Sequence, residues 1–155
     1  MGGWCFFLLT YLVNVLNQQN TKGFILTFER ELLFGRWFRE DLIGQHKKTV
    51  EYAQLSADGS FEFTFVTLET KVGAADKIVD QITELGDWGL VADIHFTITK
   101  NEIVDDQLYA ADLNDSNNYH AYRVLQLNHH VFEYQHIETE EIFIMRKIND
   151  TIGHC

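Results

Sequence analysis

The feature that most constrains the fold is a strict alternation of aromatic and polar residues at positions 61–65, which read FEFTF. A period of two is what a β-strand imposes on its side chains. The preceding residues 57–60 read ADGS, and Asp-Gly supplies the positive φ angles of a tight hairpin turn. The chain also contains no proline, a residue that central strands tolerate poorly. The sequence therefore predicts an antiparallel sheet in which one face of this strand is wholly aromatic.

Further strands are predicted by the same alternation, interrupted by turn residues. The run from Trp88 to Thr99 is taken as one long strand, with Trp88, Leu90, Ala92, Ile94, Phe96 and Ile98 on the apolar face. His95 falls on the opposite, more polar face, where we expect it to be exposed or hydrogen-bonded. The other predicted strands span residues 48–56, 119–127, 131–138 and 141–148.

The segments between these strands are expected to be irregular, apart from one helix. Residues 24–34 carry apolar side chains four apart and predict a short amphipathic helix. Residues 71–84 are expected to form a long connection that caps the sheet, and the acidic stretch 101–118 a surface loop.

An antiparallel sheet of about eight strands must bury one face and hide its edges, and closing into a barrel does both. With 155 residues the chain is long enough for one such domain. We therefore expect an all-β, up-and-down antiparallel barrel over residues 22–150, preceded by a leader, residues 1–21, and followed by a tail, residues 151–155.

The leader contains no charged side chain, and residues 4–16 read WCFFLLTYLVNVL. This apolar run has the length of a signal-peptide core but is short for a membrane span. Two interpretations are open: an export signal or short anchor, which would favour a periplasmic or membrane-anchored location, or an apolar helix packed on the domain. Membrane contact is expected only through this segment.

The charge balance restricts the classes of partner. The chain has 12 Lys and Arg against 23 Asp and Glu, a formal net charge of -11. Nucleic-acid affinity comes mainly from neutralising phosphates, so this balance argues against a nucleic-acid partner. A small ligand or a protein partner remains compatible with it. The two cysteines, Cys5 and Cys155, are not expected to form a disulfide.

One short motif carries a family resemblance. Residues 35–37 read GRW, which is similar to the Gly-x-Trp motif of lipocalins and related calycins, here followed by the hairpin and strand order of small bacterial lipocalin-like domains. The resemblance implies that Trp37 closes one end of the barrel and packs against a basic residue of the last strand. Arg146 is placed to make that cation–π contact.

A second, narrower resemblance concerns residues 57–105. Their order of Asp-Gly turn, strand, linker and Glu-Leu-Gly-Asp-Trp segment is similar to ToxS-type proteins, membrane-anchored periplasmic partners of membrane-bound transcription activators. This resemblance implies an alternative role, an accessory or sensor subunit that stabilises a membrane-bound regulator.

The main functional expectation is a non-enzymatic module that binds a small hydrophobic or amphipathic molecule inside the barrel. Polar groups such as Tyr122 or Arg123 would orient the ligand. No motif of a nucleophile, a cofactor site or a metal site is present, so no catalysis, cofactor or metal is expected, although a small enzyme on the same scaffold is a third alternative. The expected ligand-lining residues are the aromatic side chains of the inward faces: Phe61, Phe63, Phe65, Trp88, Tyr122, Phe132 and Tyr134.

Overall fold

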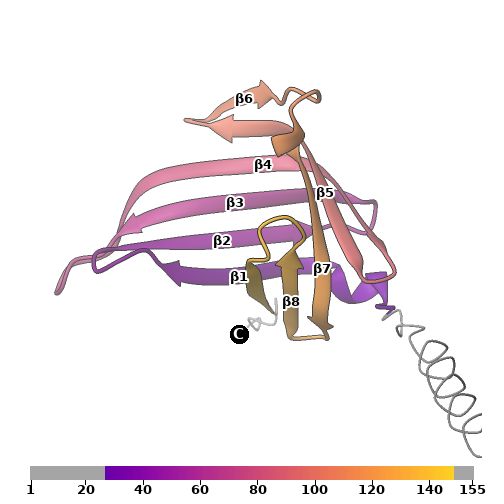
Figure 1. Ribbon diagram of the computed structural model, residues 1–155. Helices are drawn as coiled ribbons and strands as arrows, with labels where there is room; N and C mark the ends of the chain where they lie inside the picture. The colour runs from indigo at the N-terminus through magenta and orange to yellow at the C-terminus, as the bar shows by residue number, and fades with distance from the viewer. Residues whose placement is uncertain (1–26, 149–155) are drawn as a thin grey trace, which may run out of the picture.

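The aromatic strand predicted at residues 61–65 is the centre of a longer strand in a sheet that forms nearly the whole fold. The computed structural model describes residues 27–148, and Figure 1 shows their arrangement. The strands are β1 (Gly35–Leu42), β2 (Lys47–Leu55), β3 (Ser60–Glu69), β4 (Lys77–Val91), β5 (Ile94–Val104), β6 (Gln107–Ala110), β7 (Tyr119–Leu127), β8 (Val131–His136) and β9 (Ile142–Lys147). Two short 3-10 turns, η1 (Arg30–Leu33) and η2 (Ser116–Asn118), complete the described elements.

Most strands of the barrel pair with their neighbours in sequence, and the pairings of β5 with β7 and of β1 with β9 complete the ring. The order is β4-β3-β2-β1-β9-β8-β7-β5-β6, and β4 also pairs with β5. All pairings are antiparallel, so eight strands form a closed up-and-down ring and β6 extends it beside β5. The predicted all-β, up-and-down antiparallel barrel is therefore confirmed, but the short helix predicted before it is not present as such in the described residues.

The ring is uneven along its axis. β1 pairs with β2 over eight residue positions but with β9 at only two, Trp37 with Lys147 and Phe38 with Arg146. Beyond this point β1–β4 continue as a projecting sheet, which we call the arm (residues 41–49 and 67–80), visible at the left of Figure 1. The barrel therefore has a filled end beside η1 and an open end beneath the arm.

The filled end is built around Trp37. Its side chain is fully buried, and its Nε1 donates to the Leu33 carbonyl at 2.8 Å. Lys147 lies over the indole, with Nζ 5.0 Å from the ring centroid, and donates to the Leu32 carbonyl at 3.0 Å. A turn of chain and one basic side chain thus close the barrel at this end.

Two expectations at this end are wrong. The basic partner of Trp37 is Lys147 and not Arg146, because side chains alternate along β9 and Arg146 points outward to solvent. The predicted helix over residues 24–34 is reduced, within the described residues, to η1, because extended backbone at Glu29 and Phe34 limits it on both sides. Leu33 instead enters the barrel core.

The predicted strand from Trp88 to Thr99 is two strands joined by a tight hairpin. The chain reverses at Ala92 and Asp93, with Val91 paired to Ile94 and a positive φ of 56° at Ala92. The reversal changes which residues face inward: the buried positions of β5 are His95, Thr97 and Thr99. His95 is 2% exposed, so its predicted polar face is in fact an inner face of the barrel.

Two predicted connections contain strands. The first half of β4 lies within residues 71–84, where it forms part of the arm and pairs with β3. Residues 101–104 and 107–110 form a β5–β6 hairpin within the predicted acidic loop, turning at Asp105 and Asp106 with φ angles of 51° and 59°. The strands predicted at 48–56, 119–127, 131–138 and 141–148 are present within two residues at each end.

Candidate ligand-binding site

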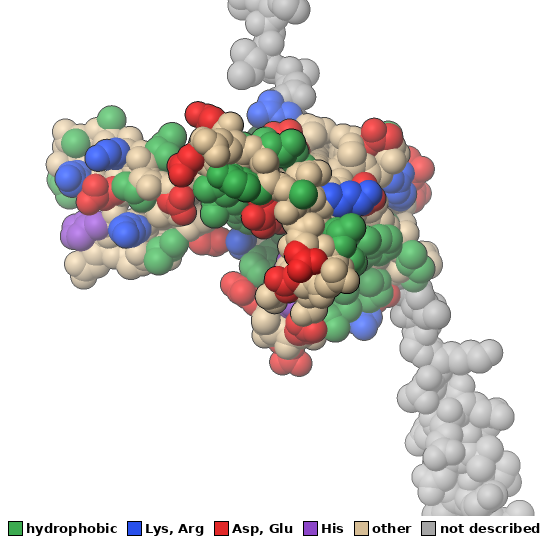
Figure 2. Space-filling model, turned by 90° about the horizontal axis from the view of Figure 1, so that it is seen from above, with side chains coloured by type: hydrophobic (Ala, Val, Ile, Leu, Met, Phe, Trp, Pro, Cys, Tyr) green, Lys and Arg blue, Asp and Glu red, His purple; other side chains and the backbone are tan. Residues whose placement is uncertain are grey.

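A cavity of about 220 Å³ lies inside the barrel between the filled end and the arm. Side chains of all eight ring strands reach it because they alternate inward along each strand. Figure 2 shows the molecule hollowed where the arm leaves the barrel. The lining residues are Arg39, Glu51, Ala53, Leu55, Phe63, Phe65, Glu84, His95, Thr97, His120, Tyr122, Phe132, Tyr134, Phe143 and Met145.

Aromatic rings form much of the wall. Tyr134 stacks on Phe132 with ring centroids 4.3 Å apart and contacts Phe143 at 5.3 Å. Tyr122 meets Tyr134 edge to face at 5.1 Å. These rings come from the three adjacent strands β7, β8 and β9 and pack against one another, so they form one continuous aromatic wall.

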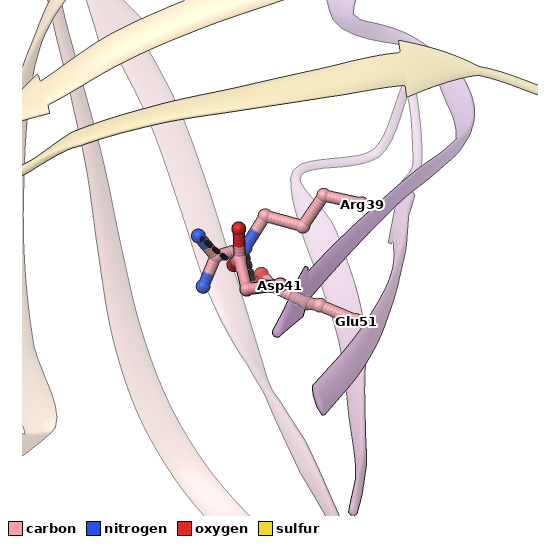
Figure 3. A network of polar contacts seen from close by, with 3 residues as sticks. All are labelled: Arg39, Asp41 and Glu51. Atoms are coloured by element: carbon pink, nitrogen blue, oxygen red, sulfur yellow. Dashed lines mark hydrogen bonds and ion pairs between the residues drawn. The ribbon is translucent and has the colours of Figure 1, made fainter. Parts of the chain in front are cut away.

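A charged network enters the cavity from β1 and β2. Arg39 Nε donates to Glu51 Oε2 at 2.5 Å, and Arg39 Nη1 pairs with Asp41 Oδ2 at 2.8 Å (Figure 3). The side chain of Glu51 is 7% exposed. Its burial raises the pKa of the Glu51 carboxyl, although the Arg39 charge acts in the opposite direction. The Arg39 guanidinium also lies 4.5 Å from the Phe143 ring centroid.

A second carboxylate, Glu84, faces the cavity from β4. Its Oε2 accepts a hydrogen bond from Thr99 Oγ1 at 3.0 Å. Partial burial raises the pKa of the Glu84 carboxyl, and the Thr99 hydrogen bond and the nearby His120 oppose that effect. None of the ion pairs formed among residues 27–148 includes Glu84.

His95 presents one ring nitrogen to the cavity. Its Nδ1 lies 3.2 Å from the Gly89 carbonyl oxygen, which can only accept, so Nδ1 carries the proton. Burial lowers the pKa of His95 to about 4, so the ring is neutral at pH 7. Its Nε2 is therefore an acceptor on the cavity side.

Two tyrosine hydroxyls are also available to a ligand. Neither Tyr122 nor Tyr134 has a hydrogen-bond partner for its hydroxyl within the described part of the chain, and no buried polar atom there is enclosed without one. Both hydroxyls therefore open onto the cavity that their rings line. Burial raises the pKa of both phenols, so both are protonated donors at neutral pH.

The structure brings most of the predicted ligand-lining residues together. Phe63, Phe65, Tyr122, Phe132 and Tyr134 line the cavity. Phe61 and Trp88 do not.

Phe61 and Trp88 are instead buried in the core cluster of the filled end. Arg30 covers the Trp88 ring there at 4.4 Å, and the indole donates to the Ser56 carbonyl at 3.0 Å. Arg123, expected to orient a ligand, lies outside the barrel and pairs with Asp93.

The charged residues of the cavity, together with His95 and Thr97, were missed by sequence reasoning. A signal for Arg39 was present, because it follows Trp37 by two residues and so shares its face. Glu51 was hidden because its neighbours Val50 and Tyr52 are the more apolar residues of this part of β2, so the alternation favoured them as the inward positions. His95 and Thr97 were assigned to the wrong face by the undetected hairpin at Ala92.

Other expectations concern metals, membranes and the chain ends. Over residues 27–148, no group of three or more His, Cys, Asp or Glu is arranged to hold a metal ion. The same residues include no helix with the length and apolarity of a membrane span. The leader and the tail lie outside the described residues, so the two interpretations of the leader stay predictions.

Comparison with known proteins yields one structural likeness to report. No protein-family model matches the chain, and no curated protein matches it in sequence. The structure is similar to the crystal structure of a lipocalin-like protein from Bacteroides uniformis, with 14% sequence identity and a TM-score of 0.41. The match covers 76% of this chain and 99% of that one.

The fold assignment rests on features of this chain alone. Its eight ring strands follow one another in an up-and-down order. A buried tryptophan from a Gly-x-Trp segment, covered by a lysine of the last strand, closes one end. The protein therefore has a lipocalin-like β-barrel fold.

Proposed function

We propose that the protein is a non-enzymatic binding module that holds a small amphipathic molecule inside its barrel. The observation that carries this proposal is the cavity itself, which combines aromatic walls with three hydrogen-bonding atoms that no protein group uses. These atoms are the hydroxyls of Tyr122 and Tyr134 and the Nε2 of His95. An apolar site with a few converging polar groups is the usual form of a small-molecule site.

The cavity volume limits the size of the ligand. Sites for drug-sized molecules are typically about 300–1,000 Å³, whereas this cavity is about 220 Å³. A molecule with one aromatic ring and a short polar arm fits this space better than a long acyl chain. The tyrosine and histidine groups would then hydrogen-bond the polar arm while the ring contacts Phe63 and Phe132.

Binding is favoured over catalysis by how the polar groups are arranged. Buried, converging polar groups would also suit an enzyme on this scaffold. Here, however, Arg39 and Glu51 neutralise each other. His95 is held by a backbone carbonyl, without a carboxylate to orient it as a base. This arrangement supports recognition of a ligand more than activation of one.

A titration with 2-phenylethanol tests the proposal. We expect it to shift the amide NMR signals of inward residues on β2, β3, β7 and β8. Ala53 is 3% exposed and lines the cavity, so Ala53→Phe should fill the site and abolish the shifts. Ala110→Phe, on the exposed strand β6, is the matched control and should leave them unchanged. No shift in the wild-type protein at millimolar ligand would refute the proposal.

A further inference from the structure

Building on the proposed function, we infer that the cavity selects a small organic cation, an ammonium attached to an aromatic ring, with Glu84 as its counter-ion. The inference comes from the balance of charge around the cavity and from the rings beside Glu84.

One carboxylate of the cavity, Glu84, has no ion-pair partner among the described residues, although His120 lies near it. Arg39 is the one Lys or Arg that lines the cavity, and it already pairs with Glu51 at 2.5 Å and with Asp41 at 2.8 Å. Glu84 makes no ion pair with any described residue, and its one side-chain hydrogen bond comes from the neutral Thr99. A ligand with a positive charge would supply the missing partner.

An aromatic ring lies next to this carboxylate. Phe63 on β3 is the direct cross-strand partner of Glu84 on β4, and both side chains line the cavity. Side chains paired in this way have Cβ atoms roughly 4.5–5.5 Å apart. An ammonium held by Glu84 would therefore lie close to the face or edge of the Phe63 ring. Cations are attracted to aromatic faces, and the effect strengthens where water is excluded.

The cavity already stabilises one cation in this manner. The guanidinium of Arg39 lies over Phe143 at 4.5 Å while pairing with carboxylates. The proposed ligand would repeat this combination of ring and carboxylate on β3 and β4, with Phe63 and Glu84 in place of Phe143 and Glu51.

The same features disfavour an anion. A carboxylate ligand would face Glu51 and Glu84, and Arg39 has both of its neighbouring carboxylates in place. The whole chain carries a formal charge of -11, which raises the local concentration of cations and lowers that of anions. The fold is therefore expected to bind a cation more tightly than a fatty acid or another carboxylate.

Three probes of nearly equal shape test the inference in the full chain at pH 7: 2-phenylethylammonium, 2-phenylethanol and phenylacetate, with affinities from calorimetry or NMR titration. We expect the ammonium to bind at least tenfold more tightly than the alcohol, and phenylacetate to bind most weakly. Raising NaCl from 20 to 300 mM should weaken binding of the ammonium and leave the alcohol unaffected.

Two variants test whether Glu84 is the residue that causes the preference for the ammonium over the alcohol. Glu84→Gln keeps the side-chain shape and removes the charge, so the preference for the ammonium over the alcohol should fall below threefold. Glu62→Gln is the matched control, because Glu62 is exposed on the outer face of β3. It should retain the full preference.

The outcomes separate the two proposals. If the alcohol binds as tightly as the ammonium, or phenylacetate binds most tightly, the cation inference is overturned and the binding module stands. If none of the three probes binds, the proposed function fails and the inference fails with it. Should Glu84→Gln not fold, the wild-type ranking of the three probes and its salt dependence still decide the matter.

Discussion

The interior of this barrel is more polar than its aromatic sequence pattern indicates. Arg39, Glu51, Glu84 and His95 all face the cavity together with the rings. Burying such groups costs free energy unless they are paired or hydrogen-bonded. Glu51 and His95 meet this condition through Arg39 and the Gly89 carbonyl. Single substitutions at such positions should have large effects that depend on pH.

The first prediction concerns His95. Its pKa is about 4 in the folded protein, against an ordinary value of 6.5. As the pH falls, His95 therefore takes up its proton in the unfolded chain before it does so in the folded protein. The free energy of unfolding consequently decreases as the pH falls from 6.5 to 4. The contribution is of the order of 3 kcal/mol. Chemical denaturation at several pH values measures it.

The comparison protein is His95→Gln, which lacks the titrating ring but can still donate to Gly89. Burial raises the pKa of Glu51 and of Glu84, so these two carboxyls make the folded protein more stable as the pH falls. Their effect is the same in the wild type and in the variant, so it cancels when the two free energies of unfolding are subtracted. As the pH falls below 6.5, the free energy of unfolding of the wild type should therefore decrease relative to that of the variant. An unchanged difference between pH 7 and pH 4 would contradict the assignment of a neutral buried ring.

The second prediction concerns the basic residue over Trp37. Lys147→Met keeps the apolar stem but loses the hydrogen bond to Leu32 and the cation over the indole. We expect a loss of about 1–2 kcal/mol in the free energy of unfolding. Arg146→Met, on the exposed side of the same strand, should change it by less than about 0.5 kcal/mol. The reverse order of the two effects in urea denaturation would restore Arg146 as the closing residue.

At the scale of elements, close contacts in the β4–β5 hairpin leave no room for a side chain at two glycine positions. At Gly86 the pairing of the two strands shifts by one residue, and an added Cβ would lie 1.9 Å from the Ile98 carbonyl oxygen. At Gly89 an added Cβ would instead meet the ring of Phe96 at 2.3 Å. A backbone oxygen cannot move aside without breaking the ladder, whereas a ring on the outer face can rotate.

The third prediction follows from this contrast. Gly86→Ala should prevent folding or cost more than about 3 kcal/mol, since the clash is with backbone on a paired strand. Gly89→Ala should cost about 1–2 kcal/mol, because Phe96 can adopt another rotamer. Circular dichroism melts of both variants test the order, and equal effects would contradict the proposed difference.

The elements that the sequence predicted correctly are those with both alternation and turn residues. β3 has three alternating phenylalanines after Asp58 and Gly59, and β7 and β8 are separated by a polar turn at Asn128. Residues 77–81 of β4 were missed because their side chains lie at the arm and are exposed on both faces, so no apolar period marks them. The hairpins at Ala92 and at Asp105 were missed because non-glycine residues adopt the positive φ angles there.

At the scale of the whole molecule, the aromatic half of the site was predictable and the charged half was not. Phe63, Phe65, Phe132 and Tyr134 follow from period-two patterns on single strands. The pairing of Arg39 from β1 with Glu51 from β2 depends on register between strands. The same is true of the placing of Glu84 from β4 and His95 from β5 around one cavity. Register in turn depends on hairpins and on the bulge near Gly86, which the pattern of one sequence does not reveal.

The fourth prediction concerns the junction of β1 and β9, where only two residue positions pair. The Ile148 amide donates to the Arg36 carbonyl there at 2.9 Å. Because so few contacts hold this junction, we expect the Ile148 amide to exchange its hydrogen at least tenfold faster than the amides paired between β2 and β3. Native-state hydrogen exchange followed by NMR measures both. Equal rates would mean that the barrel opens only by complete unfolding.

The same junction has a consequence for how the protein is made in the cell. The first strand of the ring, β1, pairs with β9, which follows it by more than a hundred residues in the sequence. The ring therefore cannot close while the ribosome is still translating the chain between these two strands. Throughout that interval the free edge of β1 is open to pairing with other nascent chains. Synthesis speed and chaperone supply, more than the stability of the finished barrel, should therefore limit the yield of soluble protein.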